Sequence, residues 1–371
     1  MPRKILFIFG TRPEAIKLCP VVLHLLRSGG FQVSVCVTAQ HRELLDQVLG
    51  AFGVSPDYDL GLMLPGQTLF QSTSRILAGL EPVLLAEKPD MVLVQGDTTT
   101  TLCGALAGFY TRTPVGHVEA GLRTGDPLRP FPEETNRVLT THLASLHFAA
   151  TEGAAANLIA EGIPRHRIAV TGNSGIDAVL YVREGLEQGR LKGLEWPQLD
   201  PARKLILVTG HRRESFGEGF ERICAALERL AGRRDVQIVY PVHPNPSVQA
   251  PVGRLLSGLG NVFLVDPLDY VPFVDLMRRA YILLTDSGGV QEEGPSLGKP
   301  VLVMRDKTER PEAVEAGTAR LVGTDTNRIV EQVSLLLENR SEYDRMARVH
   351  NPYGDGQASS RISDVILSFF K

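Results

Sequence analysis

Residues 4–14 read KILFIFGTRPE, and residues 204–214 read KLILVTGHRRE. Each stretch is a short apolar run that leads into a glycine and then basic residues, with Arg12 in the first and His211 in the second. Apolar runs of this kind are typical of strands that are covered on both faces of a parallel sheet. Doubly wound sheets bind ligands at the edge formed by the carboxyl ends of their strands. The two similar stretches therefore predict two sheets whose carboxyl-end edges face each other around one anion site. A chance similarity of the two pentapeptides is the alternative.

Further apolar runs alternate with amphipathic stretches along both halves of the chain. The expected strands are 4–9, 32–38, 91–94, 114–118 and 147–150, followed by 204–209, 236–242, 262–265, 281–285 and 300–305. This alternation is what βαβ units need, because a crossover helix must link two parallel strands. We therefore expect an α/β protein with two Rossmann-like, doubly wound domains that face a central cleft.

The expected domains are residues 1–183 and 204–356. Between them, residues 184–203 contain several glycines and prolines without a periodic apolar face, which indicates a linker. Residues 357–371 are predicted to form a C-terminal helix, and the N-terminal domain is one candidate surface for it.

The charges of the chain nearly cancel. Its 371 residues include 39 basic and 42 acidic residues, which gives a formal net charge of −3. No global field would gather nucleic acid or an anionic membrane, so any anion site must be local. The apolar runs are far shorter than the ~20 residues that cross a bilayer, and the basic start makes a poor signal peptide. We expect a cytoplasmic protein without nucleic-acid or membrane partners.

Metal and dinucleotide signatures are weak. The four cysteines are scattered, without a C-x-x-C pair, which favours buried thiols in a reducing compartment. No two histidines have ligand spacing with an acid, so no metal is expected. The turn at residues 10–14 lacks G-x-G-x-x-G, and we expect no nicotinamide or other cofactor.

The turn after the first strand favours phosphate binding. Pro13 suits the start of a helix, and Gly10 lets the backbone come close to a ligand. Arg12 and Lys17 add positive charge at a helix N-terminus that already favours anions. The alternative is a tight turn with solvated basic residues.

Residues 285–294, TDSGGVQEEG, predict a second anion site. Ser287 can cap a helix there, and the Gly288-Gly289 pair can expose backbone N–H groups to a diphosphate. Either acid of the Glu292-Glu293 pair, placed on the first turn of that helix, could hold the hydroxyls of a ribose. A plain capped helix is the alternative. Phe273 could line a base pocket or belong to the core.

Carboxylates follow successive strands of the first half. Asp97 follows the strand at 91–94, Glu119 ends the next strand, and Glu133 follows a proline-rich turn beside Glu134, which could be the inward-facing acid instead. Each could simply cap a helix. Together they favour acid–base chemistry, because proton transfer on both faces of a substrate needs more than one positioned carboxylate. His211 could donate to a leaving phosphate when protonated, whereas His117 and His243 are interpreted as structural.

With these residues assembled, the chain closely resembles the non-hydrolysing UDP-N-acetylglucosamine 2-epimerases of bacteria. The resemblance runs nearly end to end. Its motifs include FGTRPEAIK at 9–17, QGDTTTTL at 95–102, GHVEAGLRTGD at 116–126, PEETNR at 132–137, VTGHRRESFG at 208–217 and DSGGVQEEGPSLGKPVLVMRD at 286–306.

The resemblance implies a fold like that of the B-type glycosyltransferases and a role for each site residue. The residues that match positions around the UDP diphosphate are Arg12, Lys17, His211, Ser287, Gly288, Gly289 and Arg310. Glu293 matches the ribose ligand, Phe273 the uracil pocket, and Asp97, Glu119 and Glu133 the proposed acid–base groups. It also implies activation by substrate near residues 40–43 and a homodimer.

The implied reaction interconverts UDP-N-acetylglucosamine and UDP-N-acetylmannosamine for surface polysaccharide synthesis. UDP leaves to give 2-acetamidoglucal and then adds back. A UDP-sugar glycosyltransferase, a hydrolysing epimerase that releases free N-acetylmannosamine and a non-catalytic nucleotide-sugar sensor are the alternatives.

Overall fold

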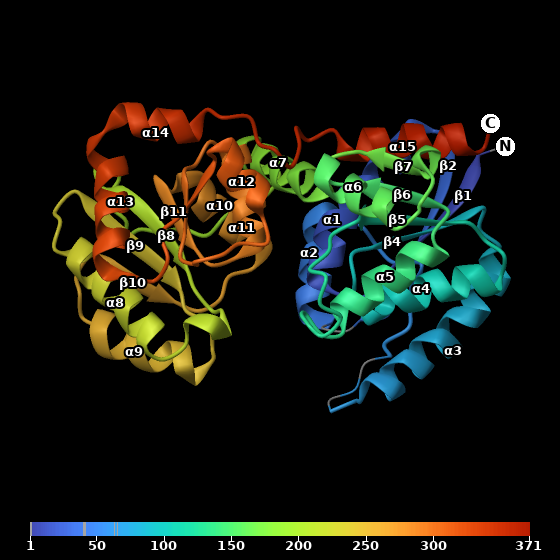
Figure 1. The fold of residues 1–371 in the computed structure, drawn as a ribbon, viewed down its shortest axis with the longest axis horizontal. Helices are drawn as coiled ribbons and strands as arrows, with labels where there is room; N and C mark the ends of the chain where they lie inside the picture. The colour runs from blue at the N-terminus through green and yellow to red at the C-terminus, as the bar shows by residue number, and fades with distance from the viewer. Residues whose placement is uncertain (1, 40–41, 63, 65) are drawn as a thin grey trace. The chain divides into compact units, whose positions relative to one another are not determined.

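A computed structural model describes residues 2–39, 42–62, 64 and 66–371 (Figure 1). The chain divides into two compact units, each built on one parallel sheet. Unit 1 comprises Met1–Ala178 and Gly354–Lys371, and unit 2 comprises Val179–Tyr353. Helix α7 (Ser174–Glu187) runs across the first division, so the helix continues into residues where the sequence indicated a linker.

Unit 1 contains a seven-stranded parallel sheet in the order β3-β2-β1-β4-β5-β6-β7. Its strands are β1 (Arg3–Phe9), β2 (Phe31–Val37), β3 (Tyr58–Asp59), β4 (Met91–Gln95), β5 (Val115–Ala120), β6 (Leu146–Ala149) and β7 (Ile168–Val170). Its other helices are α1 (Arg12–Ser28), α2 (Arg42–Phe52), α3 (Leu69–Glu87), α4 (Thr99–Tyr110), α5 (Glu133–Leu143), α6 (Glu152–Ala160) and α15 (Ala358–Phe369). The strand order reverses between β1 and β4, which places a topological switch point at their carboxyl ends.

Unit 2 repeats this plan with six parallel strands in the order β10-β9-β8-β11-β12-β13. The strands are β8 (Lys204–Thr209), β9 (Val236–Pro241), β10 (Val262–Val265), β11 (Ile282–Thr285), β12 (Val301–Val303) and β13 (Ala319–Leu321). The helices are α8 (Glu218–Ala231), α9 (Pro246–Leu256), α10 (Tyr270–Arg279), α11 (Gly288–Glu293), α12 (Pro311–Ala316), α13 (Thr326–Glu338) and α14 (Arg340–Ala347). Here the switch point lies between β8 and β11.

Burial explains why the apolar runs became central strands. In β1, residues 5–9 are all buried, and in β8, residues 205–208 are all buried. Helices cover both faces of such a strand, so every side chain enters a core and polar alternation is lost. The core of unit 2 joins α8, α9 and α13 to the sheet. No helix in the described part of the chain is long and apolar enough to cross a membrane.

The C-terminal helix α15 belongs to unit 1, where it lies along α1 (Figure 1). The carboxylate of Asp177 accepts hydrogen bonds from the backbone N–H groups of Ala358 and Ser359 at 3.2 and 2.8 Å. Arg3 stacks on the ring of Phe370 and donates to its carbonyl at 3.3 Å. These contacts attach both ends of the helix to unit 1.

Candidate active site

The turn between β1 and α1 is fastened by a buried carboxylate. Glu14 accepts the backbone N–H groups of Gly10 and Thr11 at 3.1 and 2.7 Å, and the hydroxyls of Thr98 and Thr101 at 2.8 and 3.1 Å. Burial raises the pKa of Glu14, and these hydrogen bonds oppose that shift. Because Thr98 caps α4, one side chain joins the turns that follow β1 and β4.

Arg12 and Lys17 differ in their surroundings. Arg12 lies half-buried at the start of α1, and no hydrogen bond or ion pair involves its guanidinium among the residues that the structure describes. Lys17 lies farther along the helix, where its ammonium pairs with the carboxylate of Glu119. Arg12 is thus available to an anion, whereas Lys17 already neutralises an acid.

Glu119 has an unusual backbone. Its φ of 64° lies in the left-handed region, and the pairing of β5 with β6 shifts register between Val118 and Ala120. Such a conformation costs a non-glycine residue about 1–3 kcal/mol. Gln95 at the end of β4 and Lys17 each contact one carboxylate oxygen, and only 9% of the Glu119 side chain is exposed. The bulge therefore turns the Glu119 side chain out of the regular strand pairing, and Gln95 and Lys17 fix the position of its carboxylate.

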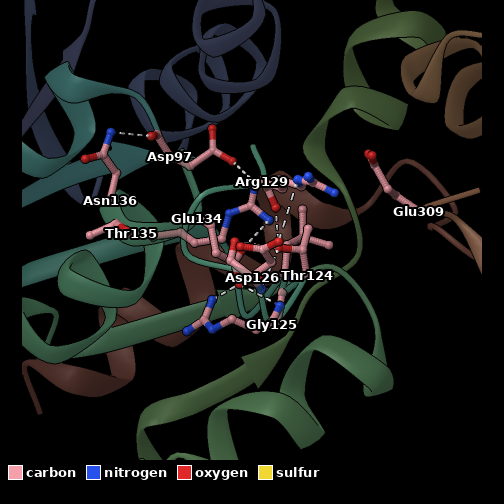
Figure 2. A network of polar contacts seen from close by, with 12 residues as sticks. Asp97, Thr124, Gly125, Asp126, Arg129, Glu134, Thr135, Asn136 and Glu309 are labelled. Atoms are coloured by element: carbon pink, nitrogen blue, oxygen red, sulfur yellow. Dashed lines mark hydrogen bonds and ion pairs between the residues drawn. The ribbon is translucent and has the colours of Figure 1, made fainter. Parts of the chain in front are cut away.

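Asp97 follows β4 and is held by helix α5. Its carboxylate pairs with Arg137, and its carbonyl oxygen accepts a hydrogen bond from the Asn136 side chain at 2.9 Å. Figure 2 shows the Asn136 contact within the surrounding polar network. The Asp97 side chain is still 27% exposed, so its carboxylate is ionically supported and reachable.

Glu133 and Glu134 take separate roles. Glu134 is buried, accepts the backbone N–H groups of Thr124 and Gly125 at 3.0 Å each, and lies 3.2 Å from Arg137 (Figure 2). Glu133 is half-buried and has no hydrogen-bond or ion-pair partner in the described part of the chain. Glu134 thus holds the loop in place, and the carboxylate of Glu133 is not engaged by the protein.

At the edge of unit 2, Asp286 organises the turn after β8. One carboxylate oxygen accepts the backbone N–H groups of His211 and Arg212 at 2.7 and 2.8 Å. The other lies 3.3 Å from Nδ1 of His211. Burial lowers the pKa of His211, and the charge of Asp286 opposes this shift. His243, predicted to be structural, stacks on the His211 ring with centroids 5.7 Å apart.

The glycine turn after β11 differs in detail from the prediction. Ser287 occupies the N-cap position of α11, but its side chain makes no capping hydrogen bond, so the predicted cap was wrong. Its backbone N–H instead donates to the Thr285 hydroxyl at 2.9 Å. Glu292 and Glu293 stand at the end of the six-residue helix, not on its first turn as predicted, because the helix starts only at Gly288.

Arg310 lies against this turn. A Cβ at Gly288 would stand 3.8 Å from the guanidinium carbon of Arg310, which is ordinary van der Waals contact and places the guanidinium beside the turn. Arg310 also pairs with the buried carboxylate of Glu292, whereas Glu293 is half-buried. Phe273 is half-buried on α10.

The structure thus divides the predicted residues between the units. Unit 1 holds Arg12, Lys17, Asp97, Glu119 and Glu133, and unit 2 holds His211, Phe273, Ser287, Gly288, Gly289, Glu293 and Arg310. Most of them follow the carboxyl ends of strands, as in other doubly wound sheets. Residues 40–41 of the segment compared with a substrate-activation site lie outside the described residues.

A cavity of about 600 Å³ in unit 2 borders the turn after β8 but is lined by other residues, including Glu214, Arg222 and Arg305. The buried guanidinium of Arg305 already pairs with Glu214 at 2.6 Å. This cavity contains no predicted site residue. Across the described ranges, no three His, Cys, Asp or Glu side chains are grouped so that they could hold a metal ion.

Comparison with known proteins identifies the family. A family model described as UDP-N-acetylglucosamine 2-epimerase matches residues 24–367. The UDP-N-acetylglucosamine 2-epimerase of Escherichia coli (strain K12) is 60% identical over 368 residues, which cover 98% of each chain. The chain belongs to the UDP-N-acetylglucosamine 2-epimerase family.

Solved structures agree with this family assignment. The crystal structure of UDP-GlcNAc 2-epimerase from Neisseria meningitidis bound to UDP-GlcNAc matches with a TM-score of 0.89 at 49% identity, covering 98% of this chain and 100% of that one. A structure of the glycotransferase of kitacinnamycin matches with a TM-score of 0.65 at 14% identity over 99% of both chains, a likeness of fold alone. The predicted α/β class with two Rossmann-like units is confirmed.

Several residues that shape the epimerase-family site were not assigned a role from the sequence. They are Glu14, Gln95, Arg137 and Asp286. All four lay inside the quoted motifs, and for Glu14 the capping box that it forms with Thr11 was a readable signal. For Gln95 and Arg137 no local signal existed, since their partners come from other elements.

Proposed function

We propose that the chain interconverts UDP-N-acetylglucosamine and UDP-N-acetylmannosamine, in line with the names of its relatives. One observation carries this proposal most directly. Glu119 lies near the end of β5, Asp97 follows the neighbouring strand β4 of the same sheet, and each carboxylate is paired with a cation. Inversion at a carbon needs proton removal on one face and delivery on the other, for which two positioned carboxylates are suited.

The chemistry explains why UDP must leave. Carbon 2 of the sugar is not next to a carbonyl, so its proton is not acidic in the intact substrate. When the bond from carbon 1 to the diphosphate oxygen breaks, positive charge develops at carbon 1 and the proton at carbon 2 becomes acidic. A carboxylate takes that proton, giving UDP and 2-acetamidoglucal. UDP then adds back to carbon 1 while an acid protonates the opposite face of carbon 2.

The anion-binding residues would stabilise the departing diphosphate. The guanidinium of Arg12 has no hydrogen-bond or ion-pair partner among the described residues, and the turn at 287–289 with Arg310 offers N–H groups and positive charge. Preorganised donors of this kind are often the largest contribution to rate. Lys17 and His211 would complete this set, with Glu293 at the ribose and Phe273 at the base.

An incubation with UDP-N-acetylglucosamine alone in deuterated water tests the proposal. We expect UDP-N-acetylmannosamine with deuterium at carbon 2, because elimination removes the original proton. Release of free N-acetylmannosamine would favour the hydrolysing epimerase, and no conversion would favour a glycosyltransferase or a sensor. Complete retention of the original proton in an epimerised product would rule out the elimination mechanism.

The same proposal includes a cytoplasmic location, a role in surface polysaccharide synthesis and a homodimer. The homodimer is supported by an exposed stripe on α3 that carries little charge. Phe70 is 89% exposed and Leu85 59% exposed, and Phe109 and Tyr110 on the neighbouring α4 are 59% and 68% exposed. Exposed apolar patches of this kind mark interaction sites, and a second copy is the occupant that we propose.

Light scattering after size-exclusion chromatography tests the homodimer. Phe70→Asp should shift the mass from dimer to monomer, because a charge would be buried in the contact. Leu26→Asp is the matched control, since Leu26 is 53% exposed on α1. A monomeric wild-type protein would contradict the homodimer and leave the epimerase proposal to its own test.

A further inference from the structure

Asp286 and His211 meet at the switch point of unit 2. Strands β8 and β11 pair in parallel with Thr209 opposite Thr285, and the hydroxyls of these two threonines lie 2.5 Å apart. The chain continues from Thr209 through Gly210 to His211, and from Thr285 directly to Asp286. The register of the sheet therefore brings an imidazole and a carboxylate together from residues 75 positions apart.

The surroundings of Asp286 leave one carboxylate oxygen for this imidazole. Only 1% of the residue is exposed. Oδ2 accepts the backbone N–H groups of His211 and Arg212. Oδ1 lies 3.3 Å from His211 Nδ1 and has no hydrogen-bond partner within the part of the chain that the structure describes. A buried carboxylate oxygen without a donor is costly, so a proton on Nδ1 would satisfy it.

We propose that Asp286 is a positioning residue that orients His211 and keeps the proton of its neutral ring on Nδ1. The half-exposed ring then has Nε2 open to a second proton, and the imidazolium so formed would donate its Nε2–H to the substrate diphosphate. The partner of one imidazole nitrogen sets the role of the other, as in the carboxylate–histidine pairs of metal sites and proteases. The part of this inference that concerns the diphosphate rests on the proposed function, and the part that concerns the proton does not.

Three groups around His211 govern its protonation. Asp286 favours the charged imidazolium, whereas Arg212 and the stacked ring of His243 disfavour it. Asp286 is the one of these three that offers a carboxylate oxygen to Nδ1. Replacing its charge should therefore change both the ring's preferred tautomer and its affinity for a proton.

Nitrogen NMR of the wild-type protein with labelled histidine tests the pair directly. At a pH where His211 is neutral, we expect Nδ1 to carry the proton and Nε2 to be unprotonated. His211→Gln assigns the signals by removing them. A wild-type ring with its proton on Nε2 would overturn the proposal, whether or not the protein epimerises a sugar and whether or not any Asp286 variant folds.

Asp286→Asn then tests the consequence. The amide oxygen of Asn can still accept the two backbone N–H groups, so the turn keeps its main contacts. Its NH₂ group would donate to Nδ1 and move the ring proton to Nε2. We expect kcat to fall by roughly 10²–10⁴-fold with KM within a fewfold of wild type, because the neutral ring can still bind the diphosphate through Nε2–H but can no longer take up the second proton that it would donate to the leaving group.

Asp235→Asn is the matched control, since Asp235 precedes β9 at the opposite end of the sheet. This variant should leave the His211 signals and kcat unchanged. A swapped tautomer with normal kcat in Asp286→Asn would overturn the positioning role. If the wild-type protein showed the expected tautomer but did not epimerise the sugar, the proposed function would be contradicted and the role of Asp286 in orienting His211 would still be supported.

Discussion

The carboxyl-end edges of the two sheets have opposite chemistry. In unit 1 the edge presents carboxylates, and Asp97 and Glu119 are each paired with a cation from a helix. In unit 2 the edge presents the His211 imidazole, the Gly288-Gly289 turn and Arg310. Its acids are buried, with Asp286 held by the backbone N–H group of His211 and Glu292 paired with Arg310. Two parallel sheets of similar strand order thus carry different side chains in the turns that follow their strands.

The way the acids are held explains the difference. Arg137 and Lys17 reach the carboxylates of unit 1 through side chains, and a part of Asp97 stays exposed. Asp286 is instead held by backbone N–H groups and is buried. A partly exposed acid that is paired with a cation can meet a substrate, whereas a buried acid bound to backbone N–H groups shapes a turn.

The largest expected effect concerns the acids of unit 1. Asp97→Asn, Glu119→Gln and Glu133→Gln keep the shape of each side chain, so the variants should fold and bind UDP. Loss of a general acid or base should lower kcat by about 10²–10⁴-fold. Steady-state kinetics with UDP binding by calorimetry measures both. Near-normal turnover in all three would remove the contrast between the two edges, and His211 would become the first candidate for proton transfer.

The next effect concerns Arg12, the basic residue of unit 1 that we propose binds the diphosphate. Arg12→Ala should weaken UDP binding by about 1.5–3 kcal/mol, the range for a hydrogen bond to a charged group, which is about 10- to 150-fold in Kd. Arg27→Ala, at the exposed last turn of the same helix, is the control. If both variants bound UDP like the wild type, Arg12 would lie outside the site and unit 1 would have a purely acidic edge.

A smaller effect separates two adjacent acids. Glu134→Gln should lower the free energy of unfolding by about 1–3 kcal/mol, because a buried acceptor of two backbone N–H groups loses its charge beside Arg137. Glu133→Gln, its half-buried neighbour, should leave that free energy within about 0.5 kcal/mol. Urea unfolding of both variants measures this, and equal losses would show that the two side chains share one structural role.

The last effect is a pH dependence of stability, and it also belongs to unit 1. Burial lowers the pKa of His147 to about 3 and that of His117 to about 4. Between these values and the pKa of about 6.5 in the unfolded chain, the unfolded state binds more protons. The free energy of unfolding should therefore fall as pH falls below about 6.5, by up to about 1.4 kcal/mol per pH unit for each histidine.

Urea unfolding between pH 7 and pH 5 measures that slope. His147→Gln should reduce the slope by up to about 1.4 kcal/mol per pH unit, the contribution of one proton. His350→Gln, at an exposed residue, should not change the slope. An unchanged slope in His147→Gln would mean that this histidine does not titrate on unfolding.

Much of the fold could be predicted from the sequence. The ten predicted strands all correspond to observed strands, from β1 to β12, because long apolar runs report burial on both faces. Strands β3, β7 and β13 were missed, and each has only two or three residues. So short a segment carries no periodic pattern, and its pairing depends on the strand beside it.

By itself the sequence determined the alternation of strands and helices and the glycine-led turns after β1, β4 and β8, because these depend on residues that are near in the chain. Only the tertiary structure decided which charges meet. Lys17 and Glu119 are 102 residues apart, Asp97 and Arg137 are 40 apart, and His211 and Asp286 are 75 apart. Such partners are chosen by strand order and register, since a short-range ion pair forms only where the sheet brings the two groups together.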